Sequence, residues 1–152
     1  MSVTIMCVKT ARKNRLDILI RKGGKLVILE RLSLAKQIDL AFREMSEELD
    51  HLSSGIVFFQ IRNNTVGKFG VRHEPIETRD GNVNRQTTAG LSAAQQRVFR
   101  RMAVQSLKLK KGWTHGEIQY EFAVRQHVLT TSILFESNYN MASLRLRLDP
   151  YE

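Results

Sequence analysis

The sequence predicts an α+β protein in which a mixed N-terminal sheet with one packed helix precedes a helical hairpin and a short C-terminal β-ribbon. Three observations predict this order. Short apolar segments rich in β-branched residues, separated by glycine or asparagine turns, fill much of residues 1–78. Apolar residues recur at helical spacing in residues 33–52 and 91–110. Residues 144–148 alternate strictly between leucine and arginine, which is typical of a half-buried strand.

The first predicted strands are short and apolar. A hairpin is expected between the second and third, because the pair Gly23-Gly24 accepts the positive φ angles of a tight turn. Cys7 lies within the first apolar run, so we expect a buried thiol with no disulfide partner, since it is the single cysteine. The three strands are expected at residues 3–8, 16–21 and 25–32.

An amphipathic helix is expected next, over residues 33–52, with Ser33 as its N-cap and Gly55 as its left-handed C-cap. Two further strands are predicted at residues 56–61 and 66–76, joined by a turn at Asn63-Asn64. The second of these strands is expected to end near Pro75. The aromatic residues of this region, Phe58, Phe59 and Phe69, are expected in the core.

A polar, turn-rich segment at residues 79–90 is the predicted linker. It divides an α+β sheet subdomain, residues 1–78, from a helical hairpin with a β-ribbon, residues 91–152. A chain of 152 residues is also compatible with one compact domain overall.

The predicted helical hairpin follows this segment. Its first helix is expected to begin at the N-cap Ser92, to run to about Lys110 and to stop at Gly112. A second helix is expected because Thr114 and Glu117 have the spacing of a capping box, flanked by the hydrophobic pair Trp113 and Ile118. Residues 128–136 fit either an extension of that helix or a strand.

This predicted order is similar in outline to a winged helix-turn-helix, in which a second helix enters the major groove of DNA. The outline carries no motif match. It also carries an objection, because Glu117 and Glu121 would be repelled by phosphates.

Basic residues are concentrated in two blocks of a chain whose formal net charge is +9. Residues 81–113 hold seven basic residues and no acidic one. A helical wheel places an apolar side, with Ala94, Val98, Met102 and Leu109, opposite a basic side. The predicted nucleic-acid-binding residues of this block are Arg97, Arg100, Arg101, Lys108, Lys110 and Lys111.

The second basic block lies near the N-terminus. Its segment from Arg21 to Lys25 could surround one anion, although an ordinary hairpin tip is the better explanation. The predicted binding residues of this block are Arg12, Lys13, Arg15, Arg21, Lys22 and Lys25.

Charge of this kind indicates an anionic partner. The leading hypothesis is a small, basic, intracellular DNA- or RNA-binding or regulatory protein whose basic amphipathic helix contacts the phosphate backbone. The alternative is a protein-interaction module, an adaptor or inhibitor that docks an acidic protein partner or self-associates into a homo-oligomer. We expect a soluble, cytoplasmic protein, because no apolar run is long enough to span a bilayer and no signal sequence is apparent.

Catalytic chemistry is not indicated by any motif, and whether the chain is an enzyme stays open, with the balance against. The histidines lack the spacing of a metal site, so no metal and no cofactor are expected. The weak acid–base candidates are His73 beside Glu74 and His115 near Glu117.

Overall fold

The structure is a computed structural model that describes residues 4–9, 16–22, 25–28, 31–83 and 89–142. Between residues 4 and 28, the structure describes only three strands. The predicted strand at residues 144–148 and the turn at Gly23-Gly24 lie outside the described residues.

The N-terminal strands form a sheet of their own, in the order β1-β2-β3. Both pairs in it are antiparallel, and Lys22 pairs with Lys25 next to the predicted turn. The three predicted strands are therefore confirmed. The prediction of one mixed N-terminal sheet is wrong, because these strands are antiparallel and, among the described residues, pair only with one another. The strands are β1 (Thr4–Lys9), β2 (Leu16–Lys22) and β3 (Lys25–Ile28).

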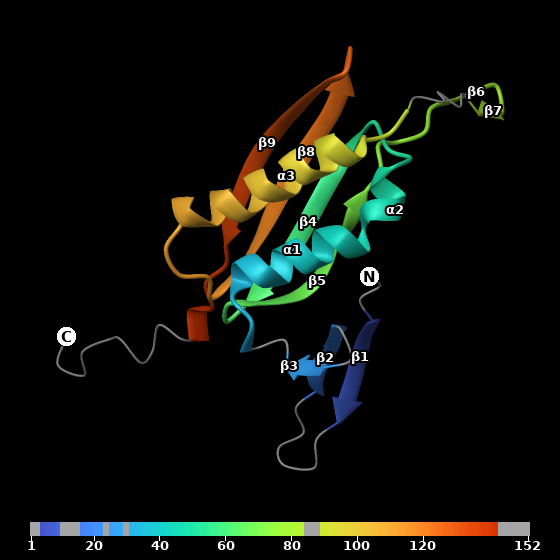
Figure 1. Cartoon of the computed structure of the whole chain (residues 1–152). Coiled ribbons are helices and arrows are strands. Elements are labelled where there is room, and N and C mark those ends of the chain that lie inside the picture. The colour runs from blue at the N-terminus through green and yellow to red at the C-terminus, as the bar shows by residue number, and fades with distance from the viewer. Residues whose placement is uncertain (1–3, 10–15, 23–24, 29–30, 84–88, 143–152) are drawn as a thin grey trace.

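A second, four-stranded antiparallel sheet has the order β5-β4-β8-β9, and two helices, α1 and α3, lie across one of its faces (Figure 1). The turn between β4 and β5 is at Asn63-Asn64 as predicted, and both residues have positive φ. A small hairpin, β6 (Thr78–Arg79) with β7 (Asn82–Val83), lies in the polar segment. The sheet strands are β4 (Ser54–Arg62), β5 (Thr65–Arg72), β8 (His115–Arg125) and β9 (Val128–Ser137).

Two serines begin the long helices, as predicted. The hydroxyl of Ser33 accepts a hydrogen bond from the Lys36 amide. Ser92 and Gln95 form a reciprocal capping box. The predicted single helix of residues 33–52 is broken at Met45, and Gly55 lies in β4 rather than at a helix end. The helices are α1 (Leu34–Glu44), α2 (Ser46–Leu49), α3 (Ala93–Ser106) and the 3-10 turn η2 (Leu107–Leu109).

The predicted second helix of the hairpin is wrong, because residues 115–125 form strand β8. Apolar and aromatic residues alternate with polar ones from Ile118 to Val124, and this period of two suits a strand with one buried face. The T-x-x-E spacing of a capping box is short enough to occur by chance. The winged helix-turn-helix outline is also wrong, because it requires that second helix. Residues 128–137 are resolved as strand β9, which forms a ribbon with β8.

The four-stranded sheet and its helices form two αββ units, α1-β4-β5 and α3-β8-β9, whose strands β4 and β8 pair with each other. This repeat is not visible in the sequence. It joins the segments on either side of residues 79–90 in one sheet, so that both helices share the same core.

The core lies between the helices and the sheet. Phe42 of α1 contacts the rings of Phe59, Phe99 and Tyr120, which come from β4, α3 and β8. Phe59 is fully buried in this core, as predicted, and Phe69 packs at its margin. Phe58 is buried as well but faces the other side of the sheet, because side chains alternate along β4.

Candidate nucleic-acid interface

Helix α3 buries a stripe that is different from the predicted apolar side. Its buried residues are Gln96, Phe99, Ala103 and Ser106. The polar members are satisfied: the Gln96 amide donates to Asp50 Oδ1 at 2.6 Å, and the Ser106 hydroxyl lies 2.9 Å from that of Tyr120. Burial raises the pKa of Tyr120 to about 12.

The predicted wheel was therefore wrong in part, because it placed Val98 and Leu109 on the buried side. Val98 is 49% exposed and Leu109 is 74% exposed. Gln96 and Ser106 are polar, so an apolar pattern does not mark them as buried. They are buried because they form hydrogen bonds in the folded chain. On the predicted basic side, Arg97 and Arg101 are exposed and lie on the side of α3 away from the sheet.

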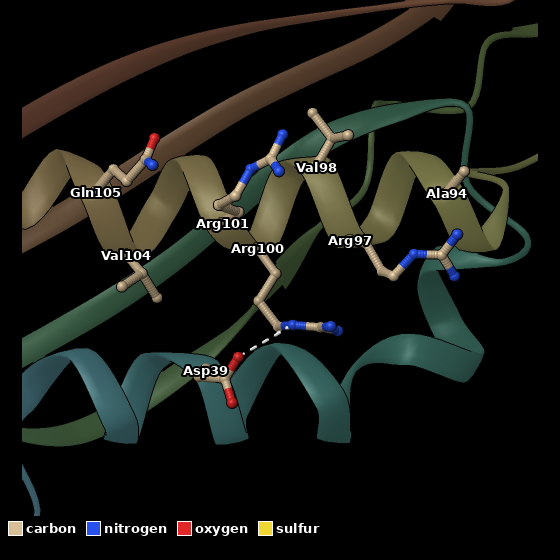
Figure 2. A pocket seen from close by; sticks show the side chains of 8 residues that line it. All are labelled: Asp39, Ala94, Arg97, Val98, Arg100, Arg101, Val104 and Gln105. Atoms are coloured by element: carbon tan, nitrogen blue, oxygen red, sulfur yellow. Dashed lines mark ion pairs between the residues drawn. The ribbon is translucent and has the colours of Figure 1, made fainter.

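A groove of about 670 Å³ runs along this side of α3, next to α1. Figure 2 shows Arg100 of α3 pointing toward Asp39 of α1, whereas Arg97 and Arg101 project from α3 in other directions. Asp39 is the one acidic residue among the groove-lining residues, which are Asp39, Ala94, Arg97, Val98, Arg100, Arg101, Val104 and Gln105.

Asp39 gathers cations from both helices. Its carboxylate lies 3.0 Å from Arg100 Nε, 3.1 Å from Arg43 Nε and 3.7 Å from Lys36 Nζ. Arg100 and Asp39 are each 20% exposed, so this pair is partly shielded from water. One carboxylate thus pairs with three cations, so two of their three positive charges remain uncompensated by it.

We call the five cations Lys36, Arg43, Arg97, Arg100 and Arg101 the groove cluster. Sequence reasoning missed Lys36 and Arg43, because the segment that contains them is acidic overall. A signal was nevertheless present. The spacing Lys36-Asp39-Arg43 places all three residues on one helix face, so that a local pair of cations flanks a single acid.

The lysines after α3 extend the basic surface. Lys108 and Lys111 are exposed. Lys110 Nζ lies 4.4 Å from the centre of the Trp113 ring and donates to the Gly112 carbonyl at 2.6 Å, so its ammonium group is already engaged.

The N-terminal basic block is described only in part. Arg21 and Lys22 lie in β2 and Lys25 lies in β3, whereas the other predicted members, Arg12, Lys13 and Arg15, lie outside the described residues.

The open face of the four-stranded sheet is electrically mixed. Glu117 on β8 accepts from Gln119 at 2.7 Å, Gln60 at 3.1 Å and Arg72 at 3.2 Å. Burial alone raises the pKa of Glu117, but these hydrogen bonds and the Arg72 charge outweigh it and lower the pKa below its ordinary value. Arg72 also covers the Phe58 ring at 4.5 Å. The open face therefore lacks the excess of positive charge found along the groove.

The weak acid–base candidates are not brought together. His73 Nε2 lies 2.6 Å from Glu48, not Glu74. His115 Nε2 accepts from Arg62, while an ionised Glu117 serves the network above and is a poor proton donor. Among the residues that the structure describes, no group of three histidine, cysteine or acidic side chains is placed to hold a metal ion. The described part of the chain also contains no helix of the length and apolarity that a membrane crossing requires.

Comparison with known proteins found no matching family model, no matching curated protein and no matching solved structure. The argument for function therefore rests on the site itself.

Proposed function

We propose that the chain binds nucleic acid through its phosphate backbone, using the groove cluster together with the lysines that follow α3. The observation that carries the proposal is a groove lined by three arginines of α3 and one acid, Asp39. Two further cations, Lys36 and Arg43 on α1, pair with that same acid. Arginine forks pair bidentately with phosphate oxygens, and each contact releases condensed counterions.

The shape of this surface favours a long polyanion over a single small anion. A helix of 14 residues such as α3 is about 21 Å long. A DNA duplex carries a negative charge per roughly 1.7 Å of its axis, so several phosphates face a helix of that length. Arg97 and Arg101 are four residues apart and project from the same side of α3, with Lys108 two turns further on.

The first experiment is a fluorescence-anisotropy titration of random double-stranded DNA and single-stranded RNA over a series of salt concentrations. We expect affinity to fall steeply with salt. The double variant Arg97→Ala/Arg101→Ala should weaken binding and reduce the salt slope by about 2, because two phosphate contacts are lost.

The matched control is Lys68→Ala/Arg125→Ala, which removes the same charge from exposed positions on strands β5 and β8 of the open sheet face. It should leave the salt slope close to that of the wild type. Equal effects of the two double variants would mean that net charge alone drives binding. No binding at low salt would overturn the proposal and leave the alternative, an acidic protein partner, which a pull-down would then address.

A further inference from the structure

Strand β9 is an edge strand of the four-stranded sheet in the part of the chain that the structure describes. Among the described residues it pairs with β8 alone, so the backbone groups along its other side lack a strand partner. From Val128 to Phe135 the strand carries no charged residue and is rich in threonine and branched apolar residues. Natural edge strands are normally protected by charge, proline or a bulge, and residues 128–135 of this one lack those protections.

The opposite edge of the same sheet is protected. Strand β5 carries Lys68 and Arg72, and Pro75 follows it closely. Pairing β5 with its own copy would bring like charges together, which is unfavourable. The two edges therefore differ in the property that decides whether a strand can join another.

Helix α3 also has an uncharged flank, which faces the side of the molecule where β9 lies. Residues 98, 102 and 105 lie roughly 140–160° around α3 from Arg100, which contacts α1, so they face the β9 side of the molecule. They are Val98, Met102 and Gln105, and Val98 is half exposed. The other exposed residues of α3 are Ala93, Ala94, Arg97 and Arg101. Val98 and Gln105 also line the groove, so this uncharged flank lies between the basic residues and the uncharged strand edge.

We propose that a second copy of this chain occupies this edge, by antiparallel pairing of β9 with β9 across a two-fold axis at Thr131. Self-complementarity carries the assignment. In this register Leu129 faces Ile133 of the second copy, and Val128 faces Leu134. The strand's three exposed large apolar residues, Val128, Ile133 and Leu134, thus all gain an apolar partner.

This register also pairs residues that belong to the same face of the sheet. Leu129 and Ile133 are opposite Val124 and Tyr120 of β8 and belong to the helix face. Val128 and Leu134 belong to the open face, where Thr130 would lie opposite Ser132. Moving the axis to Ser132 would instead place Glu136 opposite Val128 of the second copy.

The dimer has one continuous eight-stranded sheet, and the axis is perpendicular to it, so both helix pairs lie on the same face. The two groove clusters would then face the same way. The inference itself does not depend on nucleic-acid binding, because it rests on the edge and the flank alone.

The test is sedimentation velocity of the full chain over a range of concentrations in high salt, where repulsion between basic copies is screened. We expect a dimer. Leu134→Lys should weaken it by roughly one hundredfold, because the symmetry applies the change twice. The matched control is Ile76→Lys, at another highly exposed apolar residue, which follows β5 and should leave the dimer intact.

Cysteine cross-linking tests the register with conservative changes. In a Cys7→Ser background, Thr131→Cys places two thiols opposite each other on the axis, whereas Thr130→Cys and Ser132→Cys place like positions further apart along the strands. Thr131→Cys should give the most disulfide-linked dimer. A monomer at every concentration, a dimer indifferent to Leu134→Lys, or equal cross-linking at all three positions would overturn the proposal.

Discussion

Asp39 is the residue at which folding and the proposed binding oppose each other. Its carboxylate pairs with Lys36, Arg43 and Arg100, which reduces repulsion within the groove cluster. The same carboxylate places a negative charge where phosphates would lie. We therefore predict that Asp39→Asn lowers the free energy of unfolding by about 1 kcal/mol while it raises affinity for duplex DNA.

Urea denaturation and anisotropy titration measure the two effects of this substitution. Glu44→Gln is the matched control, because it removes one negative charge from an exposed position on α1 that is outside the groove lining. It should change both quantities less than Asp39→Asn does. A loss of DNA affinity in Asp39→Asn would argue that the cations need Asp39 to hold their positions.

At the scale of elements, close approach of strands β8 and β9 depends on Gly116. A Cβ atom at this position would clash with the carbonyl oxygen of Glu136 on the neighbouring strand. We predict that Gly116→Ala lowers the free energy of unfolding by about 2–3 kcal/mol, because one strand must shift from its partner.

Gly67→Ala is the comparison for that change. Gly67 lies in the edge strand β5, where the nearest atom to an added Cβ is 3.9 Å away. Alanine has a lower backbone entropy in the unfolded state, so this substitution should be neutral or slightly stabilising. Chemical denaturation of the two variants under one set of conditions checks the prediction. Equal losses would show that glycine flexibility, and not the contact with β9, matters at residue 116.

The sequence predicts elements best where a local signal and the tertiary contacts agree. Ser33 and Ser92 cap their helices, and Asn63-Asn64 turns the β4–β5 hairpin, because each acts on its own neighbours. The T-x-x-E pattern at Thr114 failed, since it is equally local but competes with the alternation of Ile118, Tyr120 and Phe122 against a buried face.

The candidate site follows the same division. The exposed positions of Arg97 and Arg101 on α3 could be predicted, because the seven basic residues of that region lie in one stretch, residues 81–113, that holds no acid. The contribution of α1 could not, since Asp39 meets Arg100 only when the two helices pack side by side on the sheet. The burial of Gln96 escaped prediction for a similar reason, because its partners Ser46 and Asp50 are 50 and 46 residues away along the chain.

At the scale of the whole molecule, the two αββ units separate charge from core. Both helices pack on one face of the sheet, so their outer sides form the basic groove. The other face of the sheet carries its own balanced network around Glu117. A polyanion that binds the groove would bridge α1 and α3, which belong to different units. Binding should therefore stabilise the whole fold and not one helix.

This coupling gives a prediction for thermal stability. At a DNA concentration one hundred times the Kd, binding to the folded state adds about 2.7 kcal/mol, which raises the Tm of a chain of this size by roughly 5–10 °C. The fluorescence of Trp113, the single tryptophan, reports unfolding because its side chain is 5% exposed. The rise should vanish in high salt, where counterion release no longer favours binding. It should also be smaller at the same DNA concentration for Arg97→Ala/Arg101→Ala. A Tm unchanged by DNA, at a concentration that saturates anisotropy, would mean that DNA binds the folded and unfolded chain equally and that the groove is not its site.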